Sequence, residues 1–330
     1  MYCIGGILEK SKQPSTDLVH RACKPVEDVR VQFFKICFFL LLFLLTDFTV
    51  YYFLKKGIIR YYGLYKDAQI LCVGHSQMVL GIDAERLSKE LGMPTVKYAV
   101  AGANVTDRMW MVQHALTLNP TVKLVIYDVD TRLFDSEGLS SASYSLFLPF
   151  IDDVVMSKYL YNHATWQEYY IAKLIKTTRF RDQTLDLALR GMLNFCENKK
   201  TGTVRIEQYQ GYLAREWQRK IRVDPSNVER FSETLDLLCA RDIKVILTYL
   251  PVMDLLNNPD RESHALLVRM IEKMVKGREQ VYFLNYNIIY EARHDLFFDP
   301  RHLNEKGKQV ITSRLINDVR GILNGGDDNR

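Results

Sequence analysis

Residues 71–76 read Leu-Cys-Val-Gly-His-Ser, and this stretch decides the fold that the sequence predicts. A short apolar run, Gln69–Val73, ends in the glycine, the histidine and the serine, and a helix-like segment, Val79–Leu91, follows. The glycine permits a tight turn between strand and helix. Open α/β sheets bind ligands at the carboxyl ends of their strands, and the N–H groups that begin a helix stabilise negative charge. Ser76 is therefore a candidate for chemistry, although a serine at this position also serves as a plain helix cap.

The rest of the chain repeats the strand-then-helix order, which predicts a parallel sheet covered by helices on both faces. The expected strands are Gln69–Val73, Thr95–Val100, Lys123–Val129, Lys244–Tyr249 and Val281–Leu284, and the expected helices are Val79–Leu91, Thr106–Leu118, Asn227–Arg241, Ser263–Lys276 and Asn304–Leu323. The alternation breaks over residues 131–224, a tyrosine-rich stretch with a mostly helical pattern. We expect an insertion between the third and fourth strands, which could be a lid, a partner surface, a glycan-binding wall or an elaborated scaffold.

An apolar segment, residues 33–54, precedes this framework. The part from Ile36 to Leu54 would span roughly 28 Å as a helix, close to the hydrocarbon thickness of a bilayer. Its apolar character on all faces favours a transmembrane helix over a buried core helix. Asp47 lies inside this span at a cost of about 3 kcal/mol, so it either faces a partner membrane helix, reaches water or is protonated.

The sequence thus divides into four parts. Residues 1–32 form a tail of mixed charge, and residues 55–67 form a basic, tyrosine-rich juxtamembrane linker. At the boundary between span and linker, Tyr51 and Tyr52 followed by Lys55 and Lys56 resemble an interfacial belt whose lysines snorkel to the headgroups. Residues 68–330 form the α/β domain. Basic residues flank the span almost equally, so the positive-inside rule gives no orientation.

Composition excludes several classes of function. The 330-residue chain is 48% apolar with a net charge of +5, and it has no long basic run, so we expect no nucleic-acid binding. Its six cysteines form no Cys-x-x-Cys pair and are expected to be small buried hydrophobic residues. His294, Asp295, Asp299 and His302 lack the spacing of a metal site, so we expect neither metal nor cofactor.

A serine hydroxyl is a poor nucleophile until a base removes its proton. Histidine is the usual base, and a carboxylate on its second ring nitrogen fixes the tautomer. Asp299 and His302 lie three residues apart on an expected loop after the last strand, where the ring can point back to the end of the first strand. This pattern predicts a Ser76–His302–Asp299 triad, although Asp299 and His302 could instead be a structural pair that caps the last helix.

Three motifs together resemble the SGNH, or GDSL-like, hydrolase superfamily. They are Gly74-His75-Ser76, Ala101-Gly102-Ala103-Asn104 after the second strand, and Asp299-Pro300-Arg301-His302-Leu303-Asn304 near the end. The resemblance covers residues 69–323 apart from the insertion, and it implies a flavodoxin-like three-layer α/β/α sandwich. It also implies that Ser76 is the nucleophile, His302 the base and Asp299 the orienting acid. The amides of Ser76 and Gly102 would then donate to the oxyanion.

The order of one amino-terminal span, Gly-x-Ser and an Ala-Gly-Ala-Asn turn is similar to membrane-anchored SGNH-like proteins that act in polysaccharide O-acylation. This likeness implies an extracytoplasmic esterase or O-acyltransferase that moves an acyl group, with acetyl the one expected, to or from a cell-surface glycan. It also implies a multi-span membrane O-acyltransferase as a partner, contacted through Asp47 and the insertion. The alternative is an accessory partner with little or no activity.

The sequence departs from the family pattern at two places. His75 stands where an aspartate is usual, and Tyr127-Asp128-Val129-Asp130 lacks the asparagine that donates to the oxyanion. Losing one such donor costs about 3 kcal/mol of transition-state stabilisation, unless Asn104 replaces it. Asp128 and Asp130 would repel an oxyanion unless they are protonated.

Overall fold

The computed structural model describes residues 29–64, 67–130, 132–135, 143–219, 222–257 and 261–325. They fall into two units, one ending at Asp47 and one beginning at Phe48. The predicted tail therefore lies mostly outside the described residues, and its last four residues, 29–32, are helical.

Helix α1 (Val29–Tyr62) contains the predicted span. It is long and apolar enough to cross a membrane, with a mean hydropathy of 2.1 over its most apolar window. Asp47 is 5% exposed, and its contact with a partner helix stays a prediction. Residues 55–62 continue the helix instead of forming the expected linker, because Leu54, Ile58 and Tyr62 recur every four residues and are buried in the core of the second unit.

The second unit is built on a parallel sheet. Its strands are β1 (Ile70–Gly74), β2 (Thr95–Ala99), β3 (Leu124–Val129), β4 (Lys244–Tyr249) and β5 (Val281–Asn285), in the order β2-β1-β3-β4-β5. This is the flavodoxin-like order, in which ligands bind at the carboxyl ends of β1 and its neighbours. β1 and β3 are buried throughout, as continuous apolar runs in a doubly covered sheet should be. The predicted fold class is confirmed.

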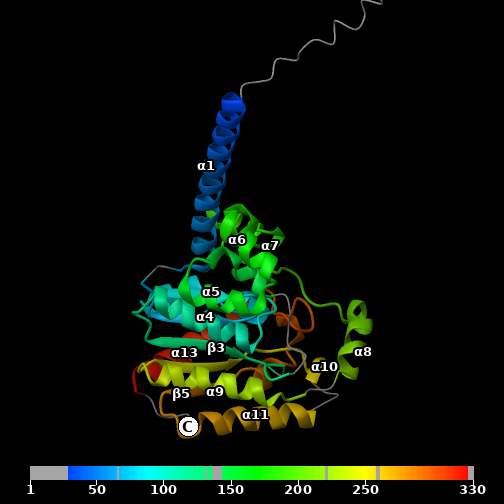
Figure 1. Ribbon diagram of the computed structural model, residues 1–330. Coiled ribbons are helices and arrows are strands. Elements are labelled where there is room, and N and C mark those ends of the chain that lie inside the picture. The colour runs from blue at the N-terminus through cyan, green and yellow to red at the C-terminus, as the bar shows by residue number, and fades with distance from the viewer. Residues whose placement is uncertain are drawn as a thin grey trace, which may run out of the picture. The chain divides into compact units, whose positions relative to one another are not determined.

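Helices cover both faces of the sheet (Figure 1). One face packs on α4 (Val105–Leu118), α9 (Pro225–Cys239), α11 (Arg261–Val275) and the end of α1. The other packs on α2 (Ser76–Gly81), α3 (Ala84–Leu91) and α13 (Glu305–Leu323). Three short helices, α10 (Asp254–Asn257), α12 (Asn287–Tyr290) and η6 (His294–Leu296), complete the carboxyl-terminal part.

The single helix expected over Val79–Leu91 is two helices. The Asp83 carboxylate accepts a hydrogen bond from the N–H of Arg86 and begins α3. The half-buried Lys97 ammonium donates to the carbonyls of Val79 and Ile82 at the end of α2. These two side chains replace the backbone bonds of a continuous helix.

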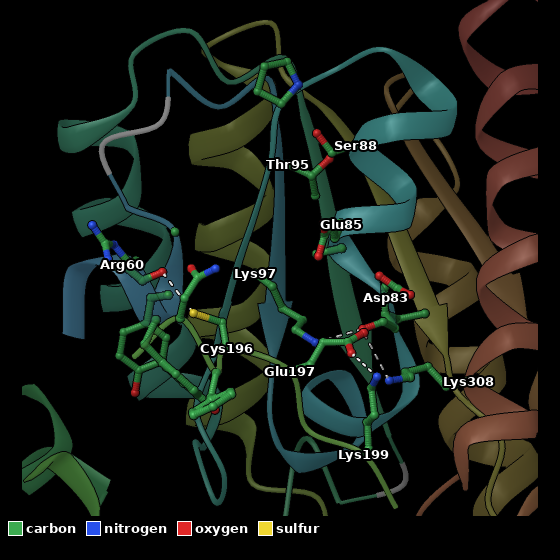
Figure 2. Close-up of a pocket in the computed structure, with 18 of the residues that line it drawn as sticks. Arg60, Asp83, Glu85, Ser88, Thr95, Lys97, Cys196, Glu197, Lys199 and Lys308 are labelled. Atoms are coloured by element: carbon green, nitrogen blue, oxygen red, sulfur yellow. Dashed lines mark hydrogen bonds and ion pairs between the residues drawn. The ribbon is translucent and has the colours of Figure 1, made fainter. Parts of the chain in front are cut away.

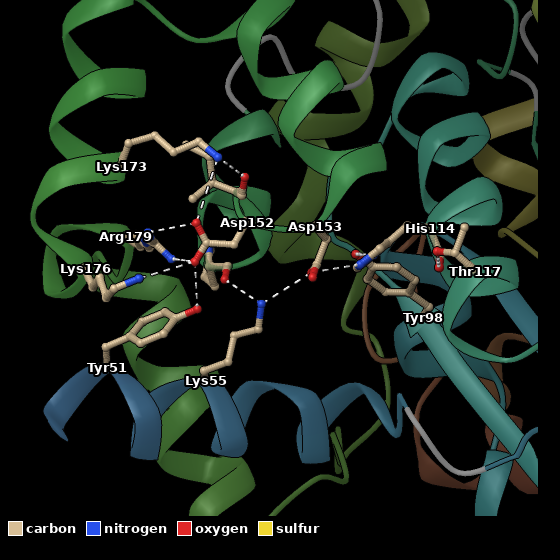
Figure 3. A network of polar contacts seen from close by, with 12 residues as sticks. Tyr51, Lys55, Tyr98, His114, Thr117, Asp152, Asp153, Lys173, Lys176 and Arg179 are labelled. Atoms are coloured by element: carbon tan, nitrogen blue, oxygen red, sulfur yellow. Dashed lines mark hydrogen bonds and ion pairs between the residues drawn. The ribbon is translucent and has the colours of Figure 1, made fainter. Parts of the chain in front are cut away.

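The insertion between β3 and β4 is helical, as predicted. Its elements are η2 (Ser143–Phe150), α5 (Val154–His163), α6 (Trp166–Leu174), η3 (Lys176–Arg179), α7 (Asp182–Met192), η4 (Ile206–Tyr209) and α8 (Gln210–Gln218). Figure 3 shows polar contacts that fix it to the end of α1. Lys55 donates to Pro149 O and Asp153, so it is held inside the protein and does not snorkel to headgroups as expected.

Candidate active site

The site begins where β1 ends. Gly74 is the last residue of β1, and Ser76 is the first residue of α2. A Cβ on Gly74 would lie 2.5 Å from Cβ of Asp128 and 2.6 Å from Cβ of Met78, so only glycine fits between β3 and the new helix. This close approach brings the carboxyl end of β3 directly beside the serine turn.

The three residues predicted to form the triad lie in one hydrogen-bonded line. Ser76 Oγ is 2.9 Å from His302 Nε2, although the two residues are 226 positions apart. His302 Nδ1 is 2.9 Å from Asp299 Oδ2 and 3.1 Å from Oδ1. All three side chains are partly exposed, so a substrate can reach them.

The loop that carries His302 is ordered by Asp299. Its Oδ1 accepts the N–H groups of Arg301 and His302 at 2.8 and 2.9 Å. Burial works to raise the pKa of Asp299, but the bonds from His302 and from these two amides outweigh it and hold the pKa below its ordinary value. An ionised carboxylate only accepts, so Nδ1 of His302 carries the proton and Nε2 is free to accept from Ser76.

Two backbone N–H groups are available beside Ser76. The Ser76 N–H belongs to the first turn of α2, and the Gly102 N–H belongs to a turn in which Gly102 has φ +79°. Across the described ranges, neither N–H has an intramolecular acceptor. Val100 N–H donates to Gly74 O, which holds this turn against the end of β1. The geometry therefore leaves both predicted oxyanion donors unused by the fold.

Asn104 is used by the fold. Its Oδ1 accepts the N–H of Asp107, and the Asp107 carboxylate accepts the N–H of Asn104, which together form the capping box of α4. Ser143 and Tyr159 of the insertion donate to the same carboxylate. Only the Nδ2 group of Asn104 is outside the cap, so its predicted role as an oxyanion donor stays a prediction.

Arg108 ties the turn that carries Gly102 to the end of β3, and sequence reasoning missed this role. Its side chain is fully buried and donates to Ala103 O at 3.2 Å and to Asp128 O at 2.6 Å. Its second terminal nitrogen lies 3.2 Å from the Asp130 carboxylate. Arg108 sits on the predicted helix over 106–118, where an arginine looks like one more surface cation.

His75 lies between the two aspartates that sequence analysis could not place. Its Nδ1 is 2.9 Å from Asp128 Oδ2, and its Nε2 is 3.1 Å from Asp130 Oδ2. The contact to Asp128 is an ion pair rather than an aligned hydrogen bond. Gln77 N–H also lies 3.2 Å from Nδ1, a bond that only neutral imidazole accepts. The Asp128 carboxylate lies closer to the same nitrogen, at 2.9 Å, and favours the protonated ring.

The charges in this cluster balance. Burial works to lower the pKa of His75, but Asp128 and Asp130 outweigh it and raise the pKa above 6.5. Burial works to raise the pKa of Asp130, but His75 and Arg108 hold it well below its ordinary value. Arg108 and, when protonated, His75 thus face two carboxylates, which offsets the repulsion of an oxyanion that the aspartates alone would cause. With both ring nitrogens engaged, His75 is a wall residue and not a second base.

We expect His75 to make stability depend on pH. A folded-state pKa raised above 6.5 adds stability below pH 6.5 that declines as pH rises through the raised pKa. The thermal midpoint of the wild type minus that of His75→Gln should therefore be larger at low pH than in alkali. A difference that is flat from weakly acidic to alkaline pH would contradict a cationic His75.

The insertion also reaches the site. Glu216 on α8 accepts from Arg301 at 2.8 Å and from Arg132 at 3.2 Å, and Tyr212 OH lies 3.1 Å from Nε of Arg301. Arg301 contacts the insertion here, and its place beside His302 in the carboxyl-terminal motif was the sequence feature that could have indicated this. α8 is thereby fixed next to the loop that carries Asp299 and His302.

A pocket of about 980 Å³ lies at the edge strand β2 and contains no triad residue (Figure 2). Burial lowers the pKa of Lys97 in its wall to about 8, but that ammonium already donates to two carbonyls. Lys308 is 2.8 Å from Glu305. The buried cations of this pocket are satisfied by the protein, so Ser76 and its neighbours remain the candidate site.

No protein-family model and no curated protein sequence matches this chain. Among solved structures, an acylhydrolase from Bacteroides fragilis matches with a TM-score of 0.37 and 12% identity, covering 76% of this chain and 86% of that chain. A GDSL-like lipase from Bacteroides thetaiotaomicron gives 0.38 and 11%, covering 77% and 90%. A protein from Streptococcus pneumonia, described as a platelet activating factor, gives 0.38 and 12%, covering 85% and 98%. At TM-scores this low the matches assign neither family nor activity, and the fold rests on the strand order.

Proposed function

We propose that this chain is a membrane-anchored, SGNH-like serine esterase or O-acyltransferase with an extracytoplasmic domain. The observation that carries the proposal is the continuous line from Ser76 Oγ through His302 to Asp299, with 2.9 Å at each step. Acyl transfer by a serine enzyme uses three groups in this order: a hydroxyl, an imidazole in the correct tautomer and an ionised carboxylate.

In the first step, His302 Nε2 takes the proton of Ser76 as Oγ attacks the carbonyl carbon of an acyl ester. The imidazolium is stabilised by Asp299, and the negative charge on the carbonyl oxygen is stabilised by the N–H groups of Ser76 and Gly102. His302 then gives its proton to the departing alkoxide, and the acyl group remains on Ser76.

In the second step, a water or a glycan hydroxyl gives its proton to His302 as its oxygen attacks the acyl carbon. The bond between that carbon and Ser76 Oγ then breaks, and His302 returns the proton to Ser76. Transfer to a glycan requires that water be excluded. We propose this role for α8 of the insertion, because Glu216 on that helix is bonded to Arg301, the neighbour of His302. We propose acetyl as the acyl group and a cell-surface polysaccharide as its acceptor or source.

One observation favours a second candidate, an accessory partner of a multi-span membrane O-acyltransferase with little activity of its own. The Oδ1 of Asn104 is committed to the cap of α4, and the end of β3 supplies two carboxylates where a side-chain donor would be needed. Such a site stabilises an oxyanion less than a complete one does. Asp47 and the insertion would then contact the partner.

A serine-directed fluorophosphonate probe separates the two candidates. We expect the full-length protein in detergent to become labelled and Ser76→Ala to remain unlabelled, because only an activated hydroxyl attacks the phosphorus. Labelling would be read by gel fluorescence and located by peptide mass spectrometry.

Ser313→Ala is the matched control, because Ser313 Oγ donates to Gln309 O within α13 and has no histidine partner. That variant should be labelled like the wild type. If a folded wild type takes up no label, the esterase is excluded and the accessory role is retained.

A further inference from the structure

Helix α6 has one apolar face that the protein does not cover. Trp166, Tyr170 and Leu174 follow one another every four residues, with Ile171 beside them, and they are 49–73% exposed. The opposite face of α6 carries Ala172, which is buried. Soluble domains seldom leave such large apolar side chains together on one surface.

Helix α7 continues this surface. Leu185, Leu189 and Met192 lie on one stripe, and Leu193 and Phe195 follow directly after the helix, all of them exposed. We call this combined surface of α6 and α7 the apolar shelf. Its residues are Trp166, Tyr170, Ile171, Leu174, Leu185, Leu189, Met192, Leu193 and Phe195.

The shelf adjoins the end of α1. A Cβ on Gly191 of α7 would lie 1.9 Å from Gly57 O of α1, so the two backbones touch. Phe180, between α6 and α7, packs against Tyr51 with ring centroids 6.3 Å apart. Figure 1 shows α6 and α7 beside this end of α1.

The side chains of α1 change from exposed to buried where the helix meets α6 and α7. Tyr52 and Phe53 are 54% and 51% exposed, whereas Leu54 and Ile58 are buried in the domain core. If α1 spans a bilayer, lipid must cover Tyr52 and Phe53, and the shelf begins at the same level. An apolar surface that starts beside a membrane span and carries tryptophan and tyrosine matches the interfacial zone of a bilayer.

We infer that the apolar shelf of α6 and α7 is embedded in the bilayer interface, so that the domain rests on the membrane as well as being tethered to it. The inference depends on the membrane anchor in the proposed function and adds a lipid-binding surface to it. The ligand is the boundary between lipid headgroups and acyl chains. Asp186 and Arg190 border the shelf and pair with each other at 3.9 Å, so the embedding needs no anionic lipid.

The test uses the single exposed tryptophan of the shelf. Full-length protein carrying Trp110→Phe and Trp217→Phe is placed in phosphatidylcholine liposomes whose acyl chains are brominated near the headgroup. We expect the Trp166 emission to fall by about half relative to unbrominated lipid, since interfacial helices sit within about 5–10 Å of the acyl boundary.

The matched control keeps Trp217 instead, with Trp110→Phe and Trp166→Phe. Trp217 is 49% exposed on α8 and donates to Leu255 O, away from the shelf. Its emission should be the same in both lipids and should be quenched by acrylamide in the water.

An unquenched Trp166 overturns the inference. If that tryptophan is also shielded from acrylamide, a second copy or another protein covers the shelf instead of lipid. Alkaline carbonate extraction of the same liposomes reports on the anchor separately. If the protein stays in the liposomes and Trp166 is not quenched, the membrane anchor is supported and the lipid contact of the shelf is refuted. If the protein is released and Trp166 was quenched, the transmembrane span is refuted and the lipid contact of the shelf is supported.

Discussion

Ester hydrolysis by His302→Ala is expected to fall by about 10⁶-fold, and hydrolysis by Asp299→Ala by about 10⁴-fold, the losses known for a base and its orienting acid that act as one unit. Without the imidazole, the Ser76 hydroxyl loses the base that faces it, since Nε2 of His302 lies 2.9 Å from Oγ. Without Asp299, the imidazole loses both its tautomer and the charge that stabilises its cation.

The measurement is the rate of p-nitrophenyl acetate hydrolysis by full-length protein in detergent, with folding checked by circular dichroism. The double variant Ser76→Ala/His302→Ala should be no slower than either single variant, because the residues act together. His294→Ala is the matched control, since His294 also pairs with a carboxylate, Asp254 at 2.8 Å, but has no serine partner. Equal losses in His294→Ala and His302→Ala would argue for a structural role of both histidines.

The Arg108→Met variant is expected to lose about 3–5 kcal/mol of unfolding free energy. Arg108 is fully buried, and removing its charge leaves Asp130 and Asp128 facing His75 alone. It also removes the donors to Ala103 O and Asp128 O, so the turn that carries the Gly102 N–H is no longer tied to β3. We therefore expect slower labelling of Ser76 in whatever fraction remains folded.

Chemical denaturation in detergent measures the loss. Adding Asp130→Asn to Arg108→Met should restore part of the stability, because the buried carboxylate is then neutral. Arg86→Met is the surface control, since the Arg86–Glu90 pair is about one-third exposed and should contribute less than about 1 kcal/mol. A loss in Arg108→Met no larger than in Arg86→Met would show that the buried cluster does not hold the site together.

The sheet was predictable because its strands are covered on both faces. Runs such as Leu124–Val129 are then apolar at almost every position and are bounded by polar turns. The meeting of Ser76 with His302 also followed from the sequence, because the carboxyl ends of parallel strands share one edge. Neither inference needed a side-chain contact.

Features that depend on how individual side chains pack between the assembled elements could not be predicted. Nothing local marks His75 as the partner of Asp128 and Asp130, or Arg108 as buried, because the ion pairs form only when β1, β3 and α4 are assembled. The helix through residues 55–62 was missed for a related reason. Its lysines and tyrosines suit a membrane surface, and only the docked insertion reveals that Lys55 has internal acceptors.

The continuation of α1 into the domain has a consequence for separating the domain from the predicted span by proteolysis. The ring of Tyr62 packs 5.0 Å from that of Tyr98 and 6.5 Å from that of Phe150, and Ile58 is fully buried. A protease that cut after Tyr62 would remove part of the hydrophobic core along with the tether. Intact shedding of this domain therefore requires a cut on the amino-terminal side of Leu54, where the chain is still apolar and exposed.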